Sequence, residues 1–578
     1  MDRSAATKVE WREWGPAAFA EAERTGRPVL LSLTAPWCSW CREMDETTYA
    51  DPRIAANVND GFVPVSVDVD RRPRVRERYN MGGFPSTVFL TPAGTIITGA
   101  TYLGPDGFRD ILDTVRRTWD ARGLDAGRVP RPLADATPPG GTVTDDVERR
   151  MVDQLGAAFD DEYGGWGSDA KFPLPETVEF ALVRARDQAL RTLEAIRTHL
   201  LDTYDGGFYR YATRRDWGDP HREKLTDENA ALVRAFARAY RYTGDEAYRD
   251  PAERTVEYLT TTLWTGDAFA GSQAGDDAYY RLGPADREAA DPPRVDDTVY
   301  AGRNALAVEA LLVLSAYVDG DRSRRYAERA LDTIRDALVD DGVVVHCRTR
   351  DERAGTKNHQ DADARERDHE RQTGGDAEAE RARERDGDEG NPERGLLVDQ
   401  ARVLAALMTA AQVTGADTAT ARAVADHALA TLQADHGAFR DGPAAGPGLL
   451  DRPLFPLDAN AAMADALFEL GVLTGADRYR RAAREAVGAF ADAADRMGVE
   501  VAGYAATAAR LSRPRVVRVG TPAGSDLHRA ALRVVDHESV VVPGADVPDG
   551  EARLFEDGDL AGTATSPAGL ADLATGDG

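Results

Sequence analysis

The most informative stretch of the sequence is the hexapeptide Pro36-Trp37-Cys38-Ser39-Trp40-Cys41. It follows the apolar run 29–33, which has the composition of a buried strand. The residues after Cys41 fit an amphipathic helix, so both cysteines are expected at a helix start. A thiolate at a helix N-terminus is stabilised by unpaired amides and by the helix dipole, which lowers the thiol pKa. A CxxC in this position predicts a thioredoxin-like redox pair.

A second motif supports this prediction. The stretch Gly82-Gly83-Phe84-Pro85-Ser86-Thr87 directly precedes another apolar strand. Thioredoxin-like folds place a cis-proline there, against the two sulfurs, and proline is the residue for which the cis form costs least, ~0.5–1 kcal/mol. We therefore expect Cys38 to attack, Cys41 to resolve the mixed disulfide, and Phe84-Pro85 to position the substrate backbone. Trp37 and Trp40 are the expected substrate contacts beside the cysteines.

The region around both motifs, residues 6–120, is predicted to be an α/β sandwich. Helical and strand patterns alternate along it. The expected helices cover 16–24, a segment after Cys38, a segment before the glycine-proline motif, and 108–117; the expected strands cover 28–33, 62–68, 86–90 and 95–98.

Beyond a Pro/Gly-rich linker at 121–142, helical patterns dominate from 143 to 512. Helices joined by recurring Gly-aromatic turns predict a closed (α/α)6 toroid; an open helical solenoid is the alternative. The segment 350–394 is almost entirely charged residues and glycine, which predicts a disordered insertion. Residues 513–578 are expected to form a small α/β tail. The predicted helices are 145–158, 176–201, 226–243, 246–263, 296–318, 322–338, 396–414, 418–433, 458–474, 476–496 and 499–511.

Composition narrows the function classes. The formal net charge is −28, which argues against nucleic acid and against anionic membranes as partners. No apolar run is long enough to span a bilayer, and the N-terminal residues lack the apolar core of a secretory signal, so we expect a cytoplasmic protein. Only four lysines occur among 71 basic residues, which indicates adaptation to high internal salt; a GC-rich genome is the alternative reason.

Three cysteines in 578 residues exclude a disulfide-stapled scaffold. Cys38 and Cys41 could instead be an inert structural pair or half of a metal site, but no second CxxC or CxxH completes such a site. We therefore predict no metal and no cofactor. Cys347 stands alone and is expected to be a buried apolar residue.

Taken together, these motifs resemble the spermatogenesis-associated protein 20 family, in which a thioredoxin-like domain precedes a toroid similar to those of sugar-processing proteins. The resemblance covers nearly the whole chain. The matching segments are Glu10-Trp11, Trp14-Gly15, Ala18-Phe19, Trp37-Cys38-Ser39-Trp40-Cys41 with Met44 and Glu46, Val67-Asp68-Val69-Asp70-Arg71-Arg72-Pro73, Gly83-Phe84-Pro85-Ser86-Thr87-Val88-Phe89-Leu90-Thr91-Pro92, Tyr102-Leu103-Gly104-Pro105, Gly164-Gly165-Trp166-Gly167, Lys171-Phe172-Pro173, Asp205-Gly206-Gly207-Phe208, Thr226-Asp227-Glu228-Asn229-Ala230, Asp296-Asp297 and Asn304-Ala305-Leu306.

The chain departs from the family pattern near the thiols. Ser39 and Arg42 stand where the family usually has histidines, and Ser32 stands where many thioredoxins keep a buried, proton-relaying aspartate. Glu43 and Asp68 are candidate replacements for that acid.

The toroid offers a second candidate site. Its expected substrate-binding residues are Trp166, Lys171, Asp227 and Asp297, and paired rim carboxylates such as Asp227 and Glu228 could serve glycoside hydrolysis. An aspartate at a helix start is also an ordinary cap. The sequence thus predicts a thiol-disulfide oxidoreductase acting on a protein or small-molecule disulfide, with the toroid as a substrate- or partner-binding module. The alternatives are a carbohydrate-active or carbohydrate-binding toroid with a docking thioredoxin-like domain, and a non-enzymatic scaffold.

Overall fold

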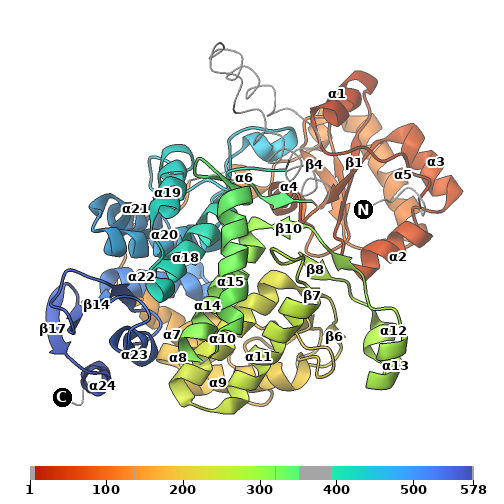
Figure 1. The fold of residues 1–578 in the computed structure, drawn as a ribbon. Coiled ribbons are helices and arrows are strands. Elements are labelled where there is room, and N and C mark those ends of the chain that lie inside the picture. The colour runs from red at the N-terminus through yellow and green to blue at the C-terminus, as the bar shows by residue number, and fades with distance from the viewer. Residues whose placement is uncertain (1–6, 135–136, 319, 350–391, 576–578) are drawn as a thin grey trace, which may run out of the picture. The chain divides into compact units, whose positions relative to one another are not determined.

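The computed structural model describes residues 7–134, 137–318, 320–349 and 392–575, coloured along the chain in Figure 1. They divide into two compact units. The first, the thioredoxin-like unit, comprises Met1–Ala136, His346–Arg394 and Gly442–Leu454; the second, the helical unit, comprises the remaining segments. Most of the predicted disordered insertion, 350–394, lies outside the described residues.

The thioredoxin-like unit is built on a four-stranded sheet in the order β2-β1-β3-β4. Strand β1 pairs parallel to β2 and antiparallel to β3, which pairs antiparallel to β4. This confirms the predicted thioredoxin-like fold. The strands are β1(Val29–Thr34), β2(Val63–Asp68), β3(Ser86–Leu90) and β4(Ile96–Ala100); the helices are α1(Pro16–Thr25), α2(Ser39–Thr47), α3(Pro52–Gly61), α4(Pro73–Tyr79), α5(Pro105–Arg122), a 3₁₀ turn at Gly123–Ala126 and α6(Arg131–Ala134).

The core of this unit fixes the place of the redox motif. Leu30 on β1 is paired with Phe89 on the neighbouring strand β3, and both are fully buried. Met44 from α2 and Phe108 from α5 pack into the same apolar cluster. The buried strand β1 and the packing of Met44 therefore hold both ends of the short segment that carries Cys38, between the end of β1 and the start of α2.

Two elements of this unit differ from the sequence prediction. Helix α3 was not predicted, although Asp51 caps it by accepting bonds from the backbone of Arg53 and Ile54. In the predicted linker 121–142, α5 continues to Arg122 and α6 forms a further short helix. Several of the glycines and prolines of this segment therefore lie at the ends of helices, and the segment is not an irregular linker throughout.

The helical unit contains a closed ring of six inner helices. Each inner helix contacts the next inner helix along the chain, and the last one, α22, contacts the first, α8. This closure confirms the predicted toroid and excludes the alternative of an open helical solenoid. Each inner helix also contacts an outer helix of its own, giving six pairs among the described residues. Figure 1 labels these helices. The inner helices are α8(Pro175–Arg184), α10(Thr226–Thr243), α14(Ala301–Tyr317), α18(Leu397–Thr414), α20(Leu457–Thr474) and α22(Ala502–Ser512); the outer ones are α9(Arg186–His199), α11(Glu246–Thr261), α15(Arg322–Thr333), α19(Ala419–Thr431), α21(Asp477–Gly488) and α7(Asp146–Ala158).

The single helix predicted over 176–201 is wrong. The chain breaks at Ala185, whose φ of −143° and ψ of 54° lie outside the helical region, and α8 and α9 form a pair there. This break supplies the twelfth helix of the ring. Helices dominate this region as predicted, and short two-residue strands also lie between them. They are β5(Tyr211–Ala212), β6(Pro220–His221), β7(Lys224–Leu225), β8(Ser272–Gln273), β9(Val295–Asp296), β10(Val299–Tyr300), β11(Val339–Asp340), β12(Val343–Val344) and β13(Cys347–Arg348), with α12(Asp277–Tyr280) and α13(Pro284–Ala289).

A repeated contact joins the Gly-aromatic turns to the inner helices. The backbone N–H of Phe208 donates to Asn229 on α10 at 2.6 Å, and the Asn229 amide donates back to the carbonyl of Phe208. Asn304 on α14 and Asn460 on α20 make the same two bonds to a turn phenylalanine. The side-chain amide satisfies both backbone groups of a buried residue, which is why the turns lie at the starts of inner helices.

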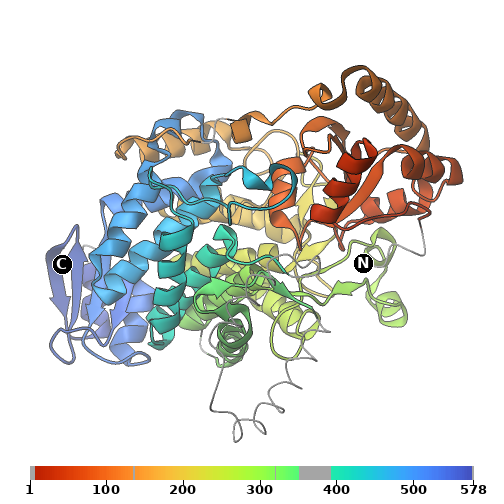
Figure 2. The same cartoon turned by 90° about the horizontal axis from the view of Figure 1, so that it is seen from above.

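The C-terminal appendage is a four-stranded sheet with two helices. Its strand order is β15-β14-β16-β17. This confirms the predicted small α/β tail. In both views the sheet, dark blue, lies beside blue helices of the same unit (Figure 2). The elements are β14(Arg515–Val519), α23(Asp526–Val534), β15(Val540–Pro543), β16(Ala552–Glu556), β17(Asp559–Ala564) and α24(Pro567–Thr575).

Candidate functional site

The two cysteines of the motif lie at the start of α2. Cys38 is the N-cap residue, and its Sγ accepts a hydrogen bond from the backbone N–H of Cys41 at 3.0 Å. The two residues form a disulfide, with 5.3 Å between their Cα atoms. The first turn of α2 contains no acidic residue to oppose the dipole. A thiolate at Cys38 would therefore receive the amide of Cys41 and the positive end of the helix.

The predicted cis-proline is present. The Phe84-Pro85 peptide bond is cis, directly before β3. The Phe84 ring meets the Trp37 ring edge to face, with 5.8 Å between their centroids. The structure thus brings together the cysteines, Trp37, Phe84 and the cis bond, all from the thioredoxin-like unit.

Exposure differs along the motif. Cys38 is 6% exposed and Cys41 is 1% exposed, so Cys38 is the more accessible sulfur. Trp40 is 47% exposed and packs its edge on Tyr102, with 5.2 Å between ring centroids. An exposed indole beside the accessible cysteine is a surface on which an apolar group of a substrate can rest.

Sequence reasoning missed a buried chain of hydrogen bonds behind Trp37. The indole N–H of Trp37 donates to Asp70 Oδ2 at 2.9 Å. The carbonyl of Asp70 is contacted by His346 Nε2 at 2.6 Å. Trp37, Asp70 and His346 are 4%, 5% and 6% exposed. Asp70 and His346 are 276 positions apart in the sequence, so no local sequence pattern indicates that they are in contact.

The candidate replacements for the missing buried aspartate lie in different settings. Glu43 is exposed and accepts a bond from the hydroxyl of Tyr102. Asp68 accepts from the backbone of Asp70. A third acid, Asp45, was not predicted; it lies one turn after Cys41 on the buried face of α2 and is 5% exposed. The i, i+4 spacing of Cys41 and Asp45 could have indicated it.

The four toroid residues of the prediction are dispersed in the helical unit. Trp166 is 3% exposed and packs against Phe159. Lys171 is fully buried, and its ammonium donates to Asp160 at 2.9 Å and to the carbonyl of Gly167. This ion pair, together with Arg215, holds the pKa of Asp160 well below its usual range, against the opposing effect of burial. Asp297 is exposed on the loop before β10.

Asp227 lies at the wall of a cavity enclosed by the inner helices, with a volume of about 500 Å³. Its carboxylate is 3.5 Å from Arg303 at the start of α14 and 3.7 Å from Arg402 on the first turns of α18. These contacts place the starts of three inner helices together at one mouth of the ring. Further acids at helix starts line the same cavity: Glu176, Glu228 and Asp458.

The pKa of Glu228 is shifted in the wall of this cavity. Burial, aided by the nearby charge of Asp227, raises the pKa of Glu228 to about 7, although Arg210 opposes the shift. Arg210 Nε lies 3.2 Å from Glu228 Oε1. A carboxyl group with a pKa near neutrality can both donate and accept a proton at physiological pH.

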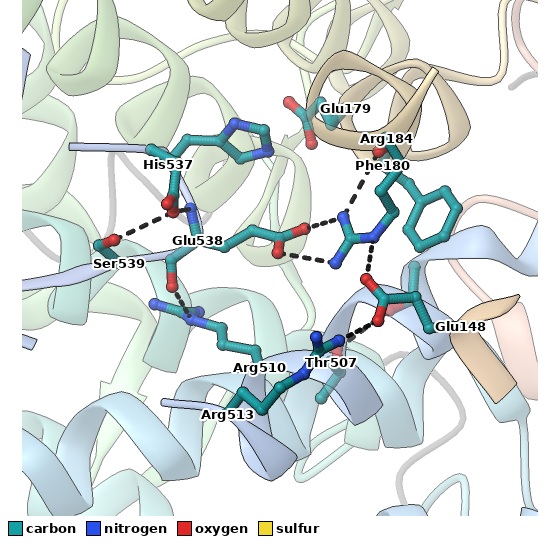
Figure 3. Close-up of polar contacts among 12 residues, drawn as sticks. Glu148, Glu179, Phe180, Arg184, Thr507, Arg510, Arg513, His537, Glu538 and Ser539 are labelled. Atoms are coloured by element: carbon teal, nitrogen blue, oxygen red, sulfur yellow. Dashed lines mark hydrogen bonds and ion pairs between the residues drawn. The ribbon is translucent and has the colours of Figure 1, made fainter. Parts of the chain in front are cut away.

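The opposite end of the cavity is occupied by the C-terminal appendage, shown in Figure 3. Arg184, at the end of α8, lies between Glu538 at 2.6 Å and Glu148 of α7. Arg510 near the end of α22 donates to the carbonyl of Glu538. His537 contacts the hydroxyl of Tyr242, at the end of α10. The appendage therefore forms a plug that closes the end of the cavity where the inner helices finish.

Within the described ranges, no group of three or more His, Cys, Asp or Glu side chains is arranged to hold a metal ion. No helix in that part of the chain combines the length and apolar character needed to cross a bilayer.

The N-terminal part of the chain is similar to known thioredoxin-like and thiol-disulfide interchange proteins. A family model named Thioredox_DsbH and described as "Protein of unknown function, DUF255" matches residues 1–130. The chain is 30% identical to the thiol:disulfide interchange protein DsbD 1 of Pseudomonas aeruginosa over 105 residues, 18% of each chain.

A longer match supports the family resemblance seen in the sequence, although over less than half of the chain rather than nearly all of it. The chain is 31% identical to spermatogenesis-associated protein 20 of Homo sapiens over 294 residues, which are 44% of this chain and 37% of that protein. The match thus spans well under half of the human protein's length. A sugar epimerase from a ruminal bacterium superposes with a TM-score of 0.44 at 13% identity, over 59% of this chain and 85% of its own. The ring assignment rests on the helix contacts described above and not on that likeness.

Proposed function

We propose that the protein is a thiol-disulfide oxidoreductase whose reacting groups are Cys38 and Cys41. The observation that carries the proposal is the position of Cys38 as the N-cap of α2, with the amide of Cys41 on its sulfur. Its greater exposure makes Cys38 the attacking thiol, and the burial of Cys41 makes that residue the resolving one.

The exchange proceeds in two balanced steps. In the reduced protein, the Cys38 thiolate attacks one sulfur of a substrate disulfide, forming a mixed disulfide and releasing the other substrate sulfur as a thiolate. The Cys41 thiolate then attacks Cys38 Sγ, which restores the disulfide present in the structure and releases the second substrate thiolate. Two electrons pass to the substrate, whose thiolates take up the two protons lost by the cysteines. A dithiol reductant regenerates the protein, and with an oxidising partner the same steps run in reverse.

The surroundings supply substrate binding. Phe84 and Pro85 lie against the motif with Trp37, and Trp40 offers an exposed aromatic face. We assign a peptide or protein disulfide as the substrate class, since an extended backbone and an apolar side chain fit these two surfaces. The helical unit is assigned as the partner-binding module. A cytoplasmic setting stays part of the proposal.

The test is reduction of a peptide disulfide by dithiothreitol, with and without the protein, at several salt concentrations. Wild-type protein is expected to accelerate the reaction, and Cys38→Ser to abolish the acceleration. Cys347→Ser is the thiol control, because Cys347 is the other described cysteine and is not part of the disulfide, and it should retain the full rate. Equal rates for wild type and Cys38→Ser would remove the proposal.

A second candidate function is carbohydrate binding or processing in the ring cavity, with the thioredoxin-like unit as a docking module. The specific observation in its favour is Glu228, whose raised pKa suits proton transfer, beside Asp227 in the cavity wall. The discriminating measurement is titration with an oligosaccharide panel. Binding that Glu228→Gln weakens would support this candidate, whereas the absence of binding across the panel would reject it.

A further inference from the structure

We propose that His346 is a positioning residue for the Cys38 thiol, acting through Asp70 and Trp37. The inference rests on the exchange chemistry proposed above and names a residue that regulates the geometry of that site. Its basis is a continuous set of buried contacts that begins at His346 and ends at the residue before Cys38.

The bonding pattern fixes the role of the imidazole. A carbonyl oxygen can only accept, so the His346 Nε2 that lies 2.6 Å from the Asp70 carbonyl carries a proton and donates. The backbone N–H of His346 donates to the carbonyl of Glu393 at 2.8 Å, which fixes the segment that presents the ring. All three residues belong to the thioredoxin-like unit, although His346 joins it from far along the chain.

Asp70 transmits the restraint to the thiol. Its backbone is held on one side by His346 and on the other by Asp68, which accepts from the Asp70 N–H at 3.0 Å. The carboxylate of Asp70 then holds the indole of Trp37 at 2.9 Å. The indole in turn packs on Phe84 before the cis bond. Fixing Asp70 therefore fixes both the wall beside Cys38 and the surface that orients the substrate.

A loss of this restraint has two opposite consequences. Trp37 directly precedes Cys38, which is 6% exposed, so we expect a Trp37 ring released from Asp70 to leave the sulfur more accessible to a small reagent. The same release moves Trp37 and Phe84 from the geometry that orients a peptide disulfide. Small-molecule reactivity should rise while exchange with a peptide falls, a divergence that simple destabilisation does not produce.

The test uses the full-length reduced protein with His346→Ala, His346→Gln and the control Tyr79→Phe. Tyr79 is a buried residue of the same unit whose hydroxyl donates to Gly94 and accepts from the backbone of Leu449, remote from Trp37 in these contacts. For each variant, the rate of Cys38 alkylation by iodoacetamide is followed by peptide mass, and kcat/KM is measured with a peptide disulfide. His346→Ala should raise the alkylation rate about threefold and lower kcat/KM about tenfold, less than the ~100-fold that a 1 Å misplacement can cost. His346→Gln should restore both, because its amide can donate, and Tyr79→Phe should change neither.

Unchanged values in His346→Ala, or a parallel fall of both together with the unfolding temperature, would overturn the role of His346. A wild-type protein that alkylates normally but exchanges no disulfide would remove the proposed function. In that case the alkylation comparison alone still decides whether His346 positions Cys38.

Discussion

The backbone N–H of Cys41 lies 3.0 Å from the Sγ of Cys38 and donates a hydrogen bond to it. Because Cys38 caps α2, its sulfur occupies the place where a serine or aspartate oxygen usually satisfies the first helical amides. The contact that caps the start of the helix is thus also the contact that stabilises a thiolate, and helix formation and thiol activation share one bond.

Removing Cys41 should stop the reaction halfway. In Cys41→Ser, Cys38 keeps its place at the helix start and can attack, but no second sulfur releases the mixed disulfide. We expect a stable covalent adduct with a peptide disulfide, detected as one peptide mass added to the intact protein. The doubly substituted protein, Cys38→Ser with Cys41→Ser, should form no adduct, and an adduct there would assign the attack to another residue.

The plug of the ring should depend on a buried ion pair. Glu538→Gln leaves the guanidinium of Arg184, whose side chain is 9% exposed, with Glu148 as its remaining carboxylate partner in Figure 3. Breaking a largely buried pair from one side should lower the free energy of unfolding by about 3 kcal/mol, measured by denaturant titration.

Glu556→Gln is the matched control for that variant. Glu556 pairs with Arg515 in the same appendage, at 3.0 Å, but its side chain is 52% exposed. Exposed pairs contribute less than about 1 kcal/mol, so this variant should have little effect. Equal losses in Glu538→Gln and Glu556→Gln would show that the ion pair at Arg184 does not hold the plug.

The asparagines of the inner helices should be essential for the turns. Asn304→Ala removes the acceptor for the buried N–H of Phe269 and the donor for its carbonyl. Unsatisfied buried groups cost ~1–3 kcal/mol each, so the free energy of unfolding should fall by about 3 kcal/mol. Thr198→Ala, on the exposed side of α9, should change it by less than about 0.5 kcal/mol. A small effect of Asn304→Ala would mean that water replaces the amide.

Glu228 should make stability depend on pH. Its pKa is raised from an ordinary value of 4.5 to about 7, so between these values the folded protein keeps a proton that the unfolded chain releases. The stability contributed by Glu228 is therefore highest at low pH and is lost as the pH rises towards about 7. Glu228→Gln should flatten the unfolding temperature over this window, whereas Glu246→Gln, on the outer helix α11, should leave the wild-type slope. A steeper profile in Glu228→Gln would contradict the assigned direction.

The redox motif was predictable because each of its parts leaves a local signal. An apolar strand, two cysteines at helical spacing and a proline before the next strand are all visible in short windows, and the cis bond at Phe84-Pro85 is present as predicted. Helix α3 had a signal too, Asp51 followed by Pro52, although it was not predicted.

Other features have no local signal. The break at Ala185 lies between two arginines, with no glycine or proline to mark it, and it arises because α8 must turn back to α9 as a pair in the ring. The plug at Arg184 joins residues 354 positions apart, and His346 reaches Asp70 across 276. Such contacts depend on the closed ring and on chain segments that return to an earlier unit, which periodicity cannot indicate.

The most direct measurement is the redox equilibrium of the Cys38–Cys41 pair. The protein is equilibrated in mixtures of reduced and oxidised dithiothreitol, free thiols are alkylated, and the peptide containing both cysteines is weighed. The account predicts one reversible two-electron transition in which both cysteines of this peptide change together, with the same curve from either direction. A pair that stays oxidised across all mixtures, or that never reforms its disulfide after reduction, would contradict it.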